Sequence, residues 1–247
     1  MPAMCARFLE PRFPPVHRAA ADGLLLIGGQ LTPAWLLAAY RRGIFPWPIV
    51  QGRSEILAWF SPDPRAILEL DALHVSRRLQ RRLRSGEFSV TCDQDFAGVV
   101  HACAQPRATN DGTWITPAIA AAYQRLHALG HAHSVEVWCD GALVGGLYGL
   151  ALGGFFAGES MFHRQRDASK VALVWLVEYL RQRGFALFDV QQPTAHLVSL
   201  GARAIPRAEF LQRLQRALEL PVAFGAAPRG ARGDSRAEKT QESPRES

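Results

Sequence analysis

A carboxylate and a carboxamide stand two positions apart at the end of an apolar run that begins at Phe185. On a β-strand, residues i and i+2 face the same side, so Asp189 and Gln191 would point together while Phe188 faces the opposite layer. Two polar acceptors at the end of a buried strand could orient and deprotonate an attacking group. The spacing is equally compatible with a polar strand end that leads into a turn at Pro193.

A second group of candidate residues is cationic. Residues 73–84 contain five arginines and no acidic side chain. On a helix, Arg77, Arg81 and Arg84 lie on one face. A merely solvated face would also carry arginines, but such faces usually mix charge signs because like charges at i,i+4 spacing repel each other. The unmixed face therefore favours phosphate binding.

Capping and turn signals predict the elements that would position these groups. Thr32-Pro33 and Thr116-Pro117 each join a threonine cap to a proline at the first helical position, and they predict helices that end near Gly43 and Gly130. Trp47 then lies between two prolines on a stiff, extended loop. Further along, a hairpin of two strands, a returning strand, a helix capped by Asp167 and the strand that ends at Gln191 form one α/β module.

Composition bounds the remaining possibilities. The 247 residues are 48% apolar and 20% charged, and the net charge is +6, which favours a polyanionic partner. Four widely spaced cysteines predict neither a disulfide framework nor a metal site. No apolar run is long enough to span a bilayer, so we expect a cytoplasmic protein without membrane association. We predict an α/β (α+β) protein with a small N-terminal domain (residues 1–62), a catalytic domain (63–223) and a disordered tail (224–247).

The motifs, taken in order, resemble a known family. They are Gly23-Leu24-Leu25, Tyr40-Arg41-Arg42-Gly43-Ile44-Phe45-Pro46-Trp47, Ser61-Pro62-Asp63-Pro64-Arg65, Gly112-Thr113-Trp114-Ile115-Thr116, Leu129-Gly130-His131-Ala132-His133-Ser134-Val135-Glu136-Val137-Trp138, Val144-Gly145-Gly146-Leu147-Tyr148-Gly149, Gly158-Glu159-Ser160-Met161-Phe162, Ala168-Ser169-Lys170 and His196-Leu197-Val198-Ser199-Leu200-Gly201-Ala202. Over about residues 20–218 the chain resembles the leucyl/phenylalanyl-tRNA–protein transferases of bacteria.

The resemblance implies a fold and an activity. The catalytic domain is expected to be acetyltransferase-like (GNAT-like) but to work without coenzyme A or any other cofactor. The partners would be tRNA charged with Leu, Phe or Met and acceptor proteins that begin with Arg or Lys. The product would enter the N-end-rule degradation pathway, and we expect the enzyme to be a monomer.

The resemblance also assigns roles to residues at matching positions. The implied tRNA-binding residues are Arg77, Arg81 and Arg84 for the acceptor stem, with Trp47 and Trp114 as a clamp for the terminal adenosine. The implied amino-acid pocket consists of Leu147, Phe156, Leu173, Leu176 and Phe188. The catalytic candidates are Asp189 and Gln191 for loss of the amine proton, Glu159 for placing the cationic N-terminus, and the backbone around Gly158 for the oxyanion.

Some residues depart from the family pattern, and two other functions stay open. Gly28-Gly29-Gln30 replaces Gly-Gly-Asp, and Phe60 replaces a second tryptophan after Trp59. Pro117 stands where some members carry a cation, and Leu147 stands where methionine occurs. The strand and helix order alone would also suit an acyl-coenzyme A-dependent N-acyltransferase, but residues 164–169 lack the glycine-rich loop that cradles phosphate. The arginine helix and tryptophans alone would suit a tRNA-binding protein without catalysis.

Overall fold

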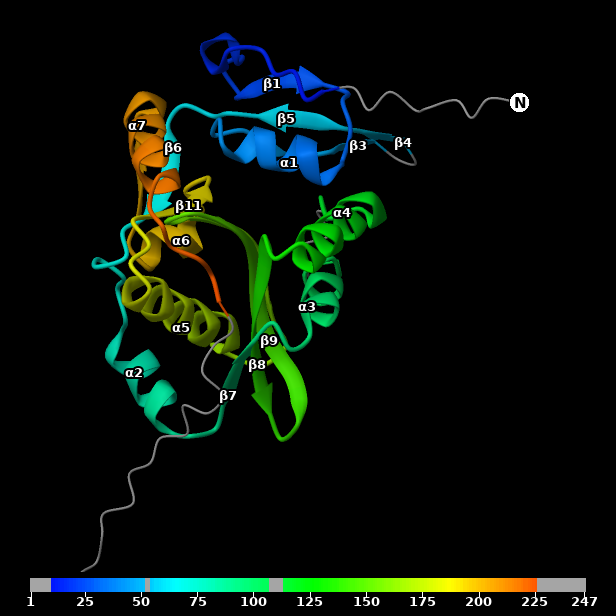
Figure 1. Ribbon diagram of the computed structural model, residues 1–247. Coiled ribbons are helices and arrows are strands. Elements are labelled where there is room, and N and C mark those ends of the chain that lie inside the picture. Colours follow the sequence, from blue (N-terminus) through cyan, green and yellow to red (C-terminus); the bar gives the residue numbers. More distant parts are fainter. Residues whose placement is uncertain (1–9, 52–53, 107–112, 226–247) are drawn as a thin grey trace, which may run out of the picture.

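The computed structural model describes residues 10–51, 54–106 and 113–225 (Figure 1). A mixed seven-stranded sheet and its covering helices form the larger part, and a smaller three-stranded sheet lies beside it. The predicted α/β (α+β) fold is confirmed. Within the described ranges, none of the helices combines the length and the apolar character needed to cross a membrane.

The smaller sheet belongs to the N-terminal part and has the order β1-β5-β2. Its elements, with the neighbouring short helix and hairpin, are η1 (Val16–Arg18), β1 (Leu24–Ile27), α1 (Pro33–Tyr40), β2 (Phe45–Pro46), β3 (Ile49–Gln51), β4 (Ser54–Ile56) and β5 (Ala58–Phe60). Phe13 packs edge-on against Trp35 and Trp59, with ring centroids 5.2 and 5.0 Å away. These aromatic contacts hold α1 against the smaller sheet. The residues that follow α1 in the chain are thereby directed toward the larger domain.

The larger sheet has the order β12-β6-β11-β10-β9-β8-β7. Its strands are β6 (Arg65–Leu68), β7 (Ser89–Cys92), β8 (Ala132–Cys139), β9 (Ala142–Leu152), β10 (Phe155–His163), β11 (Leu187–Gln191) and β12 (Ala202–Ile205). β10 and β11 run parallel, whereas the other neighbouring strands run antiparallel. Strand β6 lies next to β11 although Arg65 and Asp189 are 124 positions apart, so this sheet joins the two ends of the domain.

Helices cover both faces of the larger sheet (Figure 1). They are α2 (Arg77–Arg84), α3 (Phe96–Cys103), α4 (Pro117–Ala128), α5 (Ala168–Gln182), α6 (Ala195–Ser199) and α7 (Arg207–Leu218). The apolar side of α5 packs on one face, with Leu173, Leu176 and Leu180 buried. Helices α3 and α4 pack on the other face, where Tyr123 and Leu126 are fully buried. The sheet therefore carries a hydrophobic core on each side.

Local helix signals predicted several elements correctly. The Thr32 and Thr116 hydroxyls accept hydrogen bonds from backbone N–H groups in the first turns of α1 and α4, at 3.4 and 3.3 Å. The arginine segment is helical, with Ser76 as its cap. Asp167 is the N-cap residue of α5, as predicted, but it has φ +69° and its side chain makes no capping hydrogen bond. Its carboxylate pairs instead with Lys170 at 3.3 Å.

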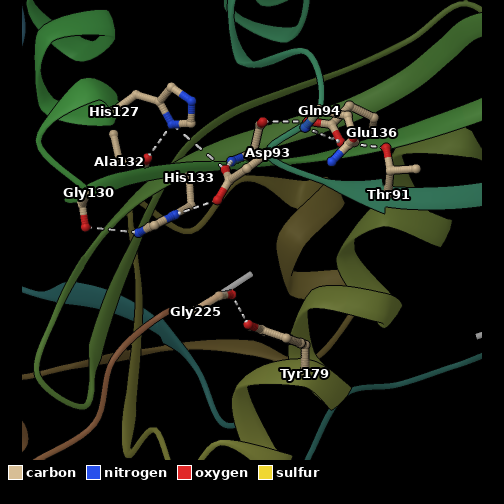
Figure 2. Close-up of polar contacts among 11 residues, drawn as sticks. Thr91, Asp93, Gln94, His127, Gly130, Ala132, His133, Glu136, Tyr179 and Gly225 are labelled. Carbon is tan, nitrogen blue, oxygen red and sulfur yellow. Dashed lines mark hydrogen bonds and ion pairs between the residues drawn. The ribbon is translucent and has the colours of Figure 1, made fainter. Parts of the chain in front are cut away.

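The predicted tail begins two residues too early. Phe224 is 8% exposed and stacks on His133 with ring centroids 4.2 Å apart. Figure 2 shows the surrounding polar contacts: His133 Nδ1 lies 2.8 Å from Asp93 Oδ2, and the Tyr179 hydroxyl donates to the Gly225 carbonyl. Phe224 and Gly225 are thus part of the folded domain, and the rest of the predicted tail, residues 226–247, lies outside the described residues.

Candidate active site

Two parallel strands separate in the middle of the larger sheet. The β10–β11 pairing runs from Phe155 opposite Leu187 to Ala157 opposite Asp189 and then stops. Beyond this point β10 continues beside β9 and β11 continues beside β6. Each strand has a bulge there, between Gly158 and Ser160 on β10 and between Asp189 and Gln191 on β11. Bulges re-aim side chains, so both strands can direct residues into the opening between them.

A cavity of about 600 Å³ lies at this opening. Eight residues with predicted functions line it: Trp47, Trp114, Leu147, Gly158, Glu159, Leu173, Phe188 and Gln191. Phe156 and Leu176 do not line it. They are fully buried behind it, where the Phe156 ring packs edge-on against Phe188 at 5.5 Å. The apolar wall also contains Met161 and Val190, to which the sequence assigned no role.

Asp189 does not line the cavity. It is completely buried, and its two oxygens receive hydrogen bonds from Arg65 Nε and Nη2 at 2.8 and 2.7 Å. Asp189 Oδ1 also accepts the backbone N–H of Gln191 at 3.0 Å. Arg65 is itself 1% exposed, and its Nη1 donates to the Gly43 carbonyl at 3.0 Å. The carboxylate therefore holds the backbone of Gln191 in place from behind the site.

The expectation that Asp189 and Gln191 point together is wrong. The bulge on β11 breaks the alternation, and Gln191 has φ +57°. As a result Phe188, Val190 and Gln191 all line the cavity, while Asp189 faces the opposite layer. A left-handed conformation at a residue other than glycine is strained, and the Asp189–Gln191 hydrogen bond helps to maintain it.

Glu159 meets two buried tyrosines at the cavity wall. Tyr40 donates to Oε1 at 2.6 Å, Tyr123 donates to Oε2 at 2.8 Å, and the two hydroxyls contact each other. Burial raises the pKa of Glu159 to about 7, although the hydrogen bonds from both tyrosines lower it in part. The negative charge of Asp189 raises this pKa further. A carboxyl group with such a pKa exchanges its proton near neutral pH.

Two buried polar groups of the cavity wall have no hydrogen-bond partner among the described residues. They are the hydroxyl of Tyr148, which is fully buried, and Nε2 of Gln191, which is 8% exposed. Buried polar atoms are usually paired, and unpaired ones in a cavity indicate where a ligand supplies the partner. The cavity thus combines an apolar wall with polar groups that are ready to bind a substrate.

Trp47 and Trp114 stack directly on each other at the cavity. Their ring centroids are 5.0 Å apart and their planes are 16° from parallel. Trp47 follows β2 of the N-terminal part, and Trp114 precedes α4, so the stack connects the two parts of the protein. A base cannot fit between rings in contact, so a clamp for adenosine requires the two tryptophans to separate.

The arginines of α2 form a separate cationic surface. Arg77, Arg81 and Arg84 are exposed, and none makes an ion pair with any residue that the structure describes. Arg81 also lines a smaller cavity of about 280 Å³ together with Arg78, Arg82 and Arg166. The sequence identified the cationic helix but missed Arg166, which the loop before α5 brings to it.

Family models match both parts of the chain. The model described as "Leucyl/phenylalanyl-tRNA protein transferase" covers residues 67–215, and the model of the N-terminal domain of the same family covers residues 29–63. The chain belongs to the leucyl/phenylalanyl-tRNA–protein transferase family. The resemblance seen in the sequence is thereby confirmed.

Members of this family in other bacteria are similar over most of their length. The leucyl/phenylalanyl-tRNA–protein transferase of Aromatoleum aromaticum is 58% identical over 203 residues, which cover 81% of this chain and 84% of that protein. The one from Stutzerimonas stutzeri is 56% identical and covers 85% and 93%. Two of the solved structures that match are more distant. L-PGS from Bacillus licheniformis is 12% identical with TM-score 0.40 and coverage of 76% and 63%. A GCN5-related N-acetyltransferase from Kribbella flavida is 11% identical with TM-score 0.36 and coverage of 70% and 60%.

Three side chains at the site received no role from the sequence. Arg65 pairs with Asp189, and Tyr40 and Tyr123 bind Glu159. Tyr40 and Arg65 stand within the motifs quoted for the family, but their partners are more than 100 residues away in sequence. The sequence did contain one signal for these roles, a charged arginine and two tyrosines in otherwise apolar surroundings. Such polar groups are buried only when they have partners, so their presence indicated buried polar contacts.

Proposed function

We propose that the protein transfers leucine or phenylalanine from aminoacyl-tRNA to the N-terminal arginine or lysine of acceptor proteins. Membership in the family over both domains is the observation that carries this proposal. Methionine is a further donor, because an unbranched side chain of similar size suits the same apolar wall. The products are substrates of N-end-rule degradation, and the reaction takes place in the cytoplasm, where charged tRNA occurs. The enzyme acts as a monomer.

Three surfaces of the protein bind three different parts of the aminoacyl-tRNA. The donor side chain packs against Leu147, Leu173 and Phe188, with Phe156 and Leu176 supporting this wall from behind. The terminal adenosine stacks on Trp47 and Trp114. The phosphates of the acceptor stem bind the exposed arginines of α2, which position the tRNA without reading its sequence.

The chemistry is aminolysis of an ester that is already activated. Binding both substrates in one cavity supplies much of the acceleration, because the attack then becomes effectively unimolecular. Gln191 uses its side-chain amide to orient the acceptor amine, and Asp189 with Arg65 holds Gln191 in position. The backbone N–H groups around Gly158 stabilise the oxyanion. Glu159 lines the cavity, and its role in this proposal is to help place the cationic N-terminus of the acceptor.

A transfer assay tests this proposal directly. The full chain is incubated with tRNA carrying radiolabelled leucine and with a peptide that begins with arginine, and labelled peptide is the expected product. A matched peptide that begins with acetylated arginine lacks the nucleophile and is expected to remain unlabelled. Absence of transfer from Leu-, Phe- and Met-tRNA, combined with acetyl transfer from acetyl-coenzyme A, would favour an acyl-coenzyme A-dependent enzyme. Tight tRNA binding with no transfer would favour a non-catalytic binding protein.

A further inference from the structure

We infer that Phe224 sets the depth of the pocket for the donor amino acid, through a row of aromatic rings that leads from the C-terminal strap to the cavity. The C-terminal strap is the segment after α7, residues 219–225, which runs beside α5 (Figure 1). The inference rests on the proposed aminoacyl transfer and adds a residue that determines which donor side chain fits. The family model ends at residue 215, so membership in the family assigns no role to the strap.

The row consists of four rings, each in contact with the next. Phe188 lines the cavity, and the ring of Phe156 packs edge-on against it with centroids 5.5 Å apart. Phe224 lies against Phe156, with centroids 5.6 Å apart and planes 30° from parallel. His133 stacks on Phe224 at 4.2 Å and forms the outer end of the row. Phe224 does not line the cavity itself, so it acts on the pocket through Phe156 and Phe188.

The sheet leaves the two inner rings no room to move toward its backbone. Gly149 and Gly158 lie opposite each other on β9 and β10. A Cβ atom at Gly149 would lie 2.4 Å from Cε1 of Phe156, and one at Gly158 would lie 2.9 Å from Cε2 of Phe188. Both distances are far below a carbon–carbon contact, so the rings fill the space that side chains at these glycines would take. The two rings therefore rest directly on the sheet.

Helix α5 bounds the same wall. Leu173 of this helix lines the cavity, and Leu176 is fully buried in the same hydrophobic cluster as Phe156 and Phe188. The wall is thus bounded by the sheet, by α5 and by Phe224. Protein interiors are close-packed, so the loss of one boundary leaves a space into which the neighbouring side chains move in part.

Phe224 is held in the row by neighbours that are themselves fixed. The Tyr179 hydroxyl donates a hydrogen bond to the carbonyl of Gly225, the residue that follows Phe224 (Figure 2). The ring of Tyr179 also lies 4.8 Å from that of Phe224. On the other side, His133 Nδ1 lies 2.8 Å from Asp93 Oδ2, which keeps the imidazole in its stacked position. The outer end of the row is therefore rigid enough to support the wall of the pocket.

This arrangement predicts how the size of the Phe224 side chain affects donor choice. Phe224→Ala removes a ring behind Phe156, so Phe156 moves into the vacated space and Phe188 follows it. The pocket becomes deeper, which leaves a gap beside leucine but admits phenylalanine and tryptophan more easily. A purely structural role of Phe224 would instead lower transfer from every donor by the same factor. The ratio between donors separates these two roles.

The experiment is a competition between two donors in one reaction. The full chain is given a peptide that begins with arginine, together with Leu-tRNA and Phe-tRNA that carry different radiolabels. The ratio of the two products reports the ratio of the two kcat/KM values and does not depend on the fraction of active protein. In Phe224→Ala we expect the ratio of phenylalanine to leucine to rise about tenfold, the discrimination that one methylene makes in an apolar pocket. Transfer from Trp-tRNA, relative to leucine, is expected to rise as well.

Two matched variants serve as controls. Phe224→Met restores apolar volume without a ring and is expected to return the ratio toward that of the wild type, because methionine fills irregular gaps. Val222→Ala shortens another apolar side chain of the strap, which packs against the same cluster outside the row, and is expected to leave the ratio unchanged. An unchanged ratio in Phe224→Ala would overturn the inference. An equal rise in Val222→Ala would overturn it too, because it would show a general loosening of the strap.

A milder variant keeps the test valid if Phe224→Ala does not fold, as judged by circular dichroism. Phe224→Leu retains part of the apolar contact, so the ratio is expected to rise in the same direction by a smaller factor. An unchanged ratio in folded Phe224→Leu would then overturn the inference. Wild-type protein that transfers no amino acid from any of the charged tRNAs would refute the proposed function itself. Wild-type transfer with the same donor ratio in the folded variants would refute only the role of Phe224.

Discussion

The pair formed by Arg65 and Asp189 yields a prediction about stability that can be worked out in numbers. Both side chains are buried, and their two hydrogen bonds measure 2.8 and 2.7 Å. Arg65 also lies between two aromatic rings, with its guanidinium carbon 4.7 Å from the ring centres of Phe45 and Phe210. Asp189→Ala leaves this charge enclosed without a counter-ion, and burying an uncompensated charge is strongly unfavourable.

We expect Asp189→Ala to lower the free energy of unfolding by about 3–5 kcal/mol. In a chain of this size each kcal/mol changes Tm by about 2–4 °C, so Tm falls by roughly 6–20 °C. Urea unfolding followed by circular dichroism measures the free energy. The matched control is Arg203→Ala, which removes an exposed ion pair with Glu69 and is expected to cost about 0–1 kcal/mol.

The double variant Arg65→Met/Asp189→Leu tests the cause. Removing both charges eliminates the unpaired ion, so the double variant is expected to be more stable than Asp189→Ala. Two results would refute the reasoning: a loss below about 1 kcal/mol in Asp189→Ala, as at exposed pairs, or a double variant that is no more stable than the single one. Under conditions where Asp189→Ala is folded, it is expected to bind aminoacyl-tRNA but to lose transfer, and unchanged turnover would contradict a role in positioning Gln191.

Three further predictions concern the substrate surfaces. Trp114→Ala is expected to weaken binding of leucyl-adenosine by about 1–3 kcal/mol, measured by calorimetry, and unchanged affinity would exclude stacking on this ring. Arg81→Ala is expected to reduce the slope of log Kd for tRNA against log salt concentration by about one, whereas Arg181→Ala, at an exposed ion pair on α5, should leave it unchanged. Leu173→Phe narrows the apolar wall and is expected to lower transfer of phenylalanine relative to leucine by about tenfold or more, in kcat/KM with each charged tRNA; an unchanged ratio would place the donor side chain elsewhere.

Local signals in the sequence were sufficient for the helices but not for the strand ends. Threonine caps and proline at the first helical position act within four residues, so the starts of α1 and α4 followed directly from the sequence. The bulge that turns Gln191 toward the cavity depends on β6, which supplies the pairing partner of β11. The residue with positive φ in this bulge is Gln191 and not a glycine, so the sequence of β11 gives no local sign of the bulge. The alternation rule therefore placed Gln191 on the wrong side.

The partners of the catalytic candidates were also beyond local reasoning. Arg65 and Asp189 are 124 positions apart, and Tyr40 and Glu159 are 119 positions apart. Their pairing depends on β6 lying beside β11 and on α1 packing against the larger domain, and neither arrangement is encoded by residue spacing. The sequence could identify Glu159 and Asp189 as candidates, but the difference between an enclosed ion pair and a carboxyl group in a cavity required the fold.

The stacked tryptophans have a consequence for affinity. To admit a purine, Trp47 and Trp114 must separate until their planes are about 7 Å apart, twice the contact distance of carbon atoms. Separation gives up the attraction between the two rings, so only a fraction of the molecules can receive adenosine, and the apparent affinity falls by that fraction. If α2 binds the tRNA phosphates as proposed, it adds free energy far from the stack, so an intact tRNA is expected to open the stack more readily than a short fragment. In the proposed site, adenosine that is not part of a tRNA lacks these phosphate contacts and is therefore expected to bind weakly.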